Sequence, residues 1–230
     1  MAKNTVSTAL ACGLTLSLVG CVTTAPPVIT TNNYNVDSKT YQATGKSERI
    51  KTIVLHYTVS DNERSIKTLT TGNVSAHYLI LDKDEFDELQ IKKVAQLVQD
   101  IAARYDISPK NIIGHADMAP SRKIDPGAKF PWKRLYIDYG IGAWYDEFDK
   151  QFFLNQDGFA SATIPEIKQA FRKYGYQIND TDTWDKASRD VIYAFQLHFR
   201  PQQPTGNMDS ETYAILQALN QKYAGKDDFY

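Results

Sequence analysis

The chain of 230 residues has only two cysteines, Cys12 and Cys21, and both lie in its first tenth. The body of the protein therefore cannot hold a disulfide framework or a cysteine-rich zinc knuckle. Any metal site in the body has to be built from His, Asp and Glu side chains.

An excess of one charge is also lacking. The 26 Lys and Arg residues are balanced by 27 Asp and Glu residues, which gives a net charge of -1. A balanced chain gives no reason to expect nucleic acid as a partner, and we expect none. Hydrophobic residues make up 42% of the chain and charged residues 23%. These fractions are typical of a globular protein, and the length allows one or two domains.

The longest apolar run, from Val6 to Val19, is too short for a membrane-spanning helix, which needs about 20 apolar residues. It follows Lys3 and has the form of a secretory signal. The run ends in Leu18-Val19-Gly20-Cys21, which resembles the lipobox of bacterial lipoproteins.

That resemblance implies a signal peptide over residues 1–20, cleavage before Cys21, and acylation of Cys21 as the lipidation site. Acyl chains would hold the protein on a membrane. Val22, rather than Asp, follows the cysteine. By the sorting rules of such lipoproteins, this implies the outer membrane, with the protein facing the periplasm. A plain signal peptide with an incidental cysteine is the alternative.

The remaining chain divides into a tether and two folded units. Residues 21–48 are rich in Thr, Asn, Pro and Ser and are predicted to be a flexible tether. We predict an α/β (α+β) domain over 49–145, with a mixed β-sheet and flanking helices. A small three-helix domain is predicted over 163–225. The elements expected in the first domain are strands at 53–55, 73–81 and 111–115, a helix at 84–105 that Asp84 caps, and a long irregular loop at 116–131.

The second unit follows a polar stretch around 151–163. Pro165 is predicted to begin a helix that reaches Tyr174, with Gly175 as its C-cap. Residues 185–199 have an amphipathic pattern, and Asp209 is a good start for the last helix.

Candidate chemistry lies at the ends of two predicted strands. His56 directly follows one apolar strand, His115 ends another, and Asp125 lies in the loop after His115. Two histidines and one carboxylate with an open fourth position are the ligand set of a hydrolytic zinc site. Lys123 could place a positive charge beside a developing oxyanion. Hydrogen-bonded structural histidines are the alternative reading, and the residues alone leave both open.

Three segments closely resemble the zinc N-acetylmuramoyl-L-alanine amidases, of the lipoprotein type found in the Gram-negative outer membrane. They are Ile53-Val54-Leu55-His56-Tyr57-Thr58, Ser75-Ala76-His77-Tyr78-Leu79-Ile80 and the loop from Gly114 to Gly127 (GHADMAPSRKIDPG). The resemblance implies Zn²⁺ held by His56, His115 and Asp125, with Lys123 stabilising the oxyanion.

The helical tail looks like a peptidoglycan-binding module, through Phe195-Gln196-Leu197-His198-Phe199 and the segment from Gly206 to Thr212. The implied partners are therefore peptidoglycan and muropeptides. We predict a structural role for His77 and a surface position for His198.

The chain departs from the family after the second predicted strand. Family members carry a long segment there, with the Glu that acts as general base. Here Leu81 leads through a few residues into the helix, near 82–86. Ala76 stands where more distant phage amidases have a catalytic Tyr. Glu85 and Glu88 are the nearest carboxylates, and we interpret both as solvated charges at a helix start.

Three functions remain open at this point. The first is an active zinc hydrolase that cleaves the amide between N-acetylmuramic acid and L-alanine. The second is a catalytically weak or inactive lipoprotein that binds peptidoglycan. The third is a purely structural tether between membrane and wall. The His, Lys and Asp set argues against the third, because a tether needs no zinc ligands.

Overall fold

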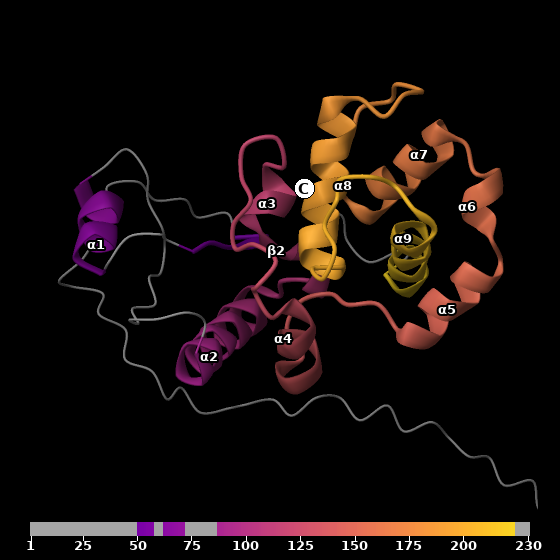
Figure 1. Ribbon diagram of the computed structural model, residues 1–230. Coiled ribbons are helices and arrows are strands. Elements are labelled where there is room, and N and C mark those ends of the chain that lie inside the picture. Colours follow the sequence, from indigo (N-terminus) through magenta and orange to yellow (C-terminus); the bar gives the residue numbers. More distant parts are fainter. Residues whose placement is uncertain (1–49, 58–61, 72–86, 224–230) are drawn as a thin grey trace, which may run out of the picture.

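The computed structural model describes residues 50–57, 62–71 and 87–223. This part of the chain is mostly helical and contains one small sheet, which confirms the mixed α/β class (Figure 1). The strand predicted at 73–81, with Ala76 and His77, lies outside the described residues, and so do Asp84 and Glu85. No helix within the described ranges is both long and apolar enough to cross a membrane.

The sheet consists of two short parallel strands, β1 (Ile53–Leu55) and β2 (Ile112–Gly114). Ile53 pairs with Ile112, and Leu55 pairs with Gly114. Their β-branched side chains suit a pleated surface, and β2 is fully buried while β1 is half-buried. Because the strands are parallel and end in register, the residues that follow them emerge at the same edge.

Helix α2 (Glu88–Tyr105) carries the long amphipathic pattern seen in the sequence. It begins four residues later than predicted, because Asp87 is its N-cap and accepts a hydrogen bond from the Gln90 N–H at 2.7 Å. Its apolar face enters the core through Ile91, Ala95, Val98 and Ile101.

The other elements of the first unit are short. Helix α1 (Asn62–Thr71) precedes α2, and the 3₁₀ turn η1 (Pro109–Asn111) leads into β2. The segment after β2 was predicted to be an irregular loop, but part of it is helical. It opens with the one-turn helix α3 (His115–Met118), and helix α4 (Trp132–Tyr139) follows the loop.

The C-terminal unit contains the three predicted helices, α7 (Ile164–Tyr174), α8 (Lys186–Phe199) and α9 (Ser210–Lys222). Each has a capping side chain at its first turn, supplied by Thr163, Asp185 and Asp209. Gly175 takes a φ of 131° at the end of α7, a conformation that favours glycine.

The polar stretch around 151–163 is largely helical, in contrast to its appearance in the sequence. It belongs to α5 (Glu147–Asn155) and α6 (Gly158–Ser161), and both pack on α9. The Lys150 ammonium lies 2.6 Å from Glu147 and 3.5 Å from Glu211 of α9. Polar side chains therefore attach α5 to the helical unit.

One hydrophobic core runs through both units. Buried side chains of the first unit, such as Leu135 and Trp144, join the same cluster as Phe171 and Phe199 of the helical unit. Helices α3 and α4 both contact α8. Figure 1 shows α3 beside α8. The two units therefore pack directly against each other.

Candidate metal centre

His56 and His115 lie side by side because of the strand register. Each directly follows one of the two parallel strands, and the last paired residues are Leu55 and Gly114. Their ring centroids are 4.2 Å apart. The pairing of the two strands therefore places the two imidazoles next to each other.

Asp125 completes the cluster from the loop. Its Oδ2 lies 3.3 Å from Nδ1 of His56 and 3.2 Å from Nδ1 of His115. Donor atoms around a tetrahedral zinc with bonds of about 2.0–2.1 Å lie about 3.3 Å apart. The two distances from Asp125 and the chemistry of the three side chains therefore fit zinc. Their ligand atoms all lie within 4.8 Å of one another and form a candidate metal cluster within the described residues.

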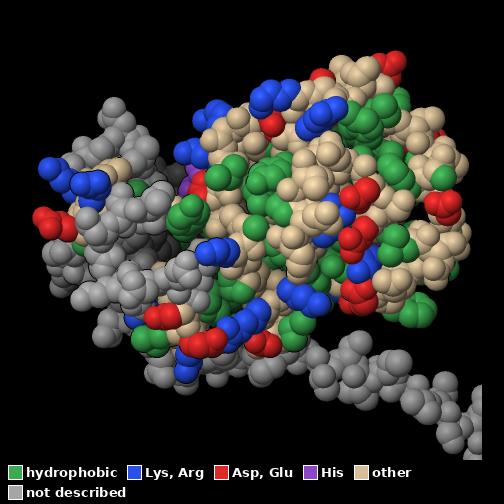
Figure 2. All heavy atoms as spheres, in the orientation of Figure 1, with side chains coloured by type: hydrophobic (Ala, Val, Ile, Leu, Met, Phe, Trp, Pro, Cys, Tyr) green, Lys and Arg blue, Asp and Glu red, His purple; other side chains and the backbone are tan. Residues whose placement is uncertain are grey.

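The centre is open on one side. The His56 side chain is 47% exposed, whereas His115 and Asp125 are 19% and 17% exposed. Histidine surface is visible beside acidic atoms on the face shown in Figure 2. Such an arrangement leaves room for a fourth ligand from solvent or substrate.

The surroundings of His56 favour the neutral form of its imidazole. Burial lowers the pKa of His56, and the nearby His115 and Lys123 lower it further, while the Asp125 carboxylate partly offsets these effects. A histidine must be neutral to bind a metal, so this shift favours binding at neutral pH.

The short helix α3 ties His115 to Asp125. The Ala116 N–H donates to the backbone carbonyl of Asp125 at 2.8 Å. A side chain at Gly114 would meet the Pro126 ring at 2.7 Å, which only glycine avoids. The end of β2 and the Asp125–Pro126 segment are therefore packed directly against each other.

Lys123 is exposed in the turn before Asp125. Its backbone N–H donates to the Ala119 carbonyl at 3.0 Å. Its positive charge helps to lower the pKa of His56, and it lies two residues before Asp125 in the chain. The structure thus brings all four predicted residues of the site into one region.

Glu88 does not belong to this region. Its carboxylate pairs with the Arg134 guanidinium of α4, with Oε1 2.5 Å from Nη1. This pairing lowers the pKa of Glu88. Glu88 is thus an exposed charge at a helix start, as predicted, and its ion pair with Arg134 was not predicted.

His198 is buried, so its predicted surface position is wrong. Its side chain is 3% exposed, its ring stacks on Trp132 at 3.9 Å, and its Nδ1 lies 2.8 Å from Asp117 Oδ2. Asp117 also accepts hydrogen bonds from the Gly114 N–H at 2.8 Å and the Tyr176 hydroxyl at 2.5 Å. Sequence reasoning missed this cluster. The signal was present, because His198 lies seven residues after Val191 on the apolar face of α8.

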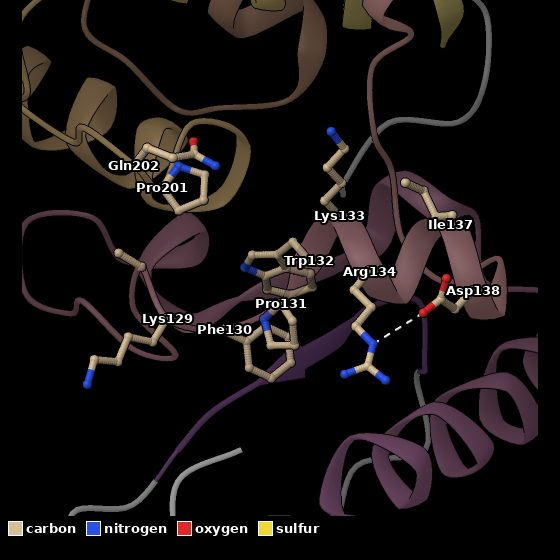
Figure 3. A pocket seen from close by; sticks show the side chains of 11 residues that line it. Lys129, Phe130, Pro131, Trp132, Lys133, Arg134, Ile137, Asp138, Pro201 and Gln202 are labelled. Carbon is tan, nitrogen blue, oxygen red and sulfur yellow. Dashed lines mark hydrogen bonds and ion pairs between the residues drawn. The ribbon is translucent and has the colours of Figure 1, made fainter. Parts of the chain in front are cut away.

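A groove of about 390 Å³ opens where the two units meet. In Figure 3, Pro201 and Gln202 lie on one side of it, and residues of α4 with the segment before it form the other. Trp132, which stacks on His198, lies between them. The groove is lined by Ala128, Lys129, Phe130, Pro131, Trp132, Lys133, Arg134, Ile137, Asp138, Pro201 and Gln202.

Two family models match the chain. The model described as "N-acetylmuramoyl-L-alanine amidase" matches residues 81–128, a range that includes His115, Lys123 and Asp125. The model described as "Putative peptidoglycan binding domain" matches residues 160–216.

A curated relative, the N-acetylmuramoyl-L-alanine amidase AmiD of Escherichia coli (strain K12), is 32% identical to the chain. The match covers 92% of this chain and 96% of the relative. It extends over 270 aligned positions, more than the 230 residues of this chain. The relative therefore has residues with no counterpart here.

Solved structures are similar along most of the chain. AmpDh3 from Pseudomonas aeruginosa matches with a TM-score of 0.71 and 32% identity, over 83% of this chain and 99% of that one. AmiD from E. coli, solved with the substrate anhydro-N-acetylmuramic acid-L-Ala-D-gamma-Glu-L-Lys, matches with a TM-score of 0.67 and 31% identity. That match covers 86% of this chain and 98% of that one.

Proposed function

The chain belongs to the N-acetylmuramoyl-L-alanine amidases, and from that premise we propose that it is a zinc hydrolase whose metal is held by His56, His115 and Asp125. As a peptidoglycan amidase, it cleaves the amide bond between N-acetylmuramic acid and L-alanine.

The spacing of the three side chains carries the proposal. Asp125 Oδ2 lies 3.3 and 3.2 Å from the two imidazole Nδ1 atoms, close to the spacing of donors around tetrahedral zinc. Two of these residues are held by paired strands, so little ordering is needed when the metal binds.

When bound, zinc supplies a Lewis acid that polarises the scissile carbonyl and favours hydroxide over water at neutral pH. The chain's own residues do the rest. His56 and His115 provide neutral donors, and the Asp125 carboxylate balances part of the metal's charge. The Lys123 ammonium offers a positive charge to the oxyanion as the carbonyl carbon becomes tetrahedral.

Peptidoglycan and muropeptides are the proposed substrates and partners. AmpDh3 of P. aeruginosa is described in complex with anhydromuramic pentapeptide, and the helical unit here matches a peptidoglycan-binding family. Basic side chains gather along the upper edge of the face in Figure 2, above α3 and α8. Such an edge suits the carboxylates of a stem peptide.

A weakly active wall-binding lipoprotein is the second candidate. The observation that favours it is the shortened region near 82–86, where the family carries its general-base Glu. The alignment with AmiD spans 270 positions against the 230 residues of this chain, so that relative carries residues that this chain lacks. The residual rate of hydrolysis separates the two candidates.

Lys123→Ala tests the proposed mechanism. We expect kcat to fall by about 10²–10³-fold, because one stabilising contact to the oxyanion is lost. KM should change little, and both the variant and the unchanged chain should carry about one zinc per chain. Kinetics on a purified muropeptide and metal analysis measure these quantities.

Arg122→Ala is the matched control, because it removes the same charge from the neighbouring exposed position. It should affect kcat far less than Lys123→Ala does. Equal losses in the two variants would mean that general charge, not Lys123, matters. If metal analysis finds no zinc in the protein without substitutions, the metal site itself is contradicted.

We propose that Cys21 anchors the protein to the outer membrane, on the evidence of its lipobox. Cys21→Ser should abolish lipid attachment, because the acylated thiol is lost. After cell fractionation, the variant should leave the membrane fraction or remain unprocessed. Equal membrane association of the variant and the unchanged protein would contradict the anchor.

A further inference from the structure

Three consecutive residues of α3, His115 to Asp117, contact three different parts of the molecule. His115 faces the proposed metal, and the Ala116 N–H donates to the Asp125 backbone. The Ala116 side chain packs with Ala194 and Leu197 of α8. Asp117 points the other way, toward the helical unit. A displacement of this single turn would therefore move one metal ligand and disturb the backbone of another.

Asp117 fixes the start of that turn. Its Oδ2 accepts the backbone N–H of Gly114, the residue immediately before His115. The carboxylate is only 5% exposed, and a buried carboxylate has to be compensated by donors. Two of its three donors, His198 and Tyr176, come from the helical unit.

Both donors are held in place. His198 lies flat against Trp132, and Asp117 is the only hydrogen-bond partner of its ring within the described part of the chain. Burial and the Asp117 charge raise the pKa of Tyr176 well above its usual range, so its hydroxyl keeps the proton that it donates. The helical unit thus presents two rigid donors to the turn that carries His115.

We propose that His198, supported by Tyr176, is a positioning residue for the metal centre, so that the helical unit helps to build the site as well as to bind peptidoglycan. This inference rests on the proposed zinc site. Replacing His198 with an apolar residue leaves the Asp117 carboxylate short of a donor in a buried place. The carboxylate would then turn away from Gly114, and His115 would shift with the backbone.

Four variants of the full chain test the proposal. His198→Leu keeps the volume and loses the donor, whereas His198→Asn can place an amide N–H near the position of Nδ1. Tyr176→Phe removes the second donor. Tyr223→Phe is the control, because it removes a buried hydrogen bond to the Trp144 backbone without touching α3.

Zinc affinity, measured by competition with a chelator, is the primary readout, and thermal unfolding reports on the fold. We expect His198→Leu and Tyr176→Phe to weaken zinc binding by about tenfold or more, as loss of groups that orient ligands does. His198→Asn should restore most of the affinity, and Tyr223→Phe should leave it unchanged. With Co²⁺ in place of zinc, the visible spectrum should change in His198→Leu and Tyr176→Phe and stay the same in Tyr223→Phe.

Unchanged affinity in a folded His198→Leu variant would overturn the proposal. So would an equal loss in Tyr223→Phe, which would point to general destabilisation. If His198→Leu fails to fold, Tyr176→Phe and His198→Asn still decide the question. If the unchanged chain binds no zinc, the proposed function fails as well. If it binds zinc and the variants bind equally, only this inference fails.

Discussion

Replacing His115 with alanine is expected to remove both the zinc and nearly all amide hydrolysis. The remaining His56 and Asp125 would be two ligands, one fewer than a catalytic zinc site uses. Lewis-acid stabilisation contributes several kcal/mol, and each ~1.4 kcal/mol is tenfold in rate, so kcat/KM should fall by at least about 10⁴-fold. Metal analysis and the release of stem peptide from a muropeptide measure the two effects.

Lys186→Ala is a suitable control for that experiment. It breaks an exposed ion pair with Asp190 at the start of α8 and should change neither zinc content nor rate. Thermal unfolding should show that His115→Ala remains folded. Full activity of a folded His115→Ala variant would refute the ligand assignment.

The second large effect concerns the general base that we propose this chain lacks. We expect the unchanged enzyme to turn over about 10²–10⁴-fold more slowly than E. coli AmiD on the same muropeptide, because a general base typically contributes that factor. This is about 3–5 kcal/mol in activation free energy. The comparison requires kcat for both purified enzymes, each loaded with zinc.

Glu88→Gln accompanies that comparison. Because its carboxylate is tied to Arg134 on α4, we expect the rate to stay nearly constant. A rate equal to that of AmiD that disappears in Glu88→Gln would show that this carboxylate serves as the base. The interpretation of the shortened region would then be wrong.

The sequence grouped His56, His115 and Asp125 as a candidate metal site mainly through the family resemblance, and the structure brings the three side chains together. Three apolar residues of β1 are followed by His56, and β2, which ends at Gly114, is followed by His115. Once the two strands pair in parallel, both histidines emerge at one edge. The loop from His115 to Asp125 is short enough to return the carboxylate to the same place.

What the sequence did not reveal depends on contacts between distant segments. His198 and Asp117 are 81 residues apart, and neither residue alone indicates that they meet. The periodicity of α8 placed His198 on an apolar face, but the usual polarity of histidine suggested a surface position. Burial became favourable through the stack on Trp132 and the bond to Asp117.

The polar stretch before α7 shows a second reason why the sequence did not predict every element. Helix α5 has four apolar residues among nine, but Phe148 and Phe152 are exposed, so its pattern gave no clear buried face. Its attachment to α9 relies partly on Lys150, whose long side chain reaches Glu211. Such ion pairs leave no periodic signal in a sequence.

The central claim is best tested by following one muropeptide with and without metal. The purified full chain, loaded with zinc, should release a stem peptide that begins with L-alanine and leave N-acetylmuramic acid, both identified by mass spectrometry. Removing the metal with a chelator should stop the reaction, and added Zn²⁺ should restore it. The same products, formed at the same rate after complete metal removal, would contradict a zinc hydrolase built on His56, His115 and Asp125.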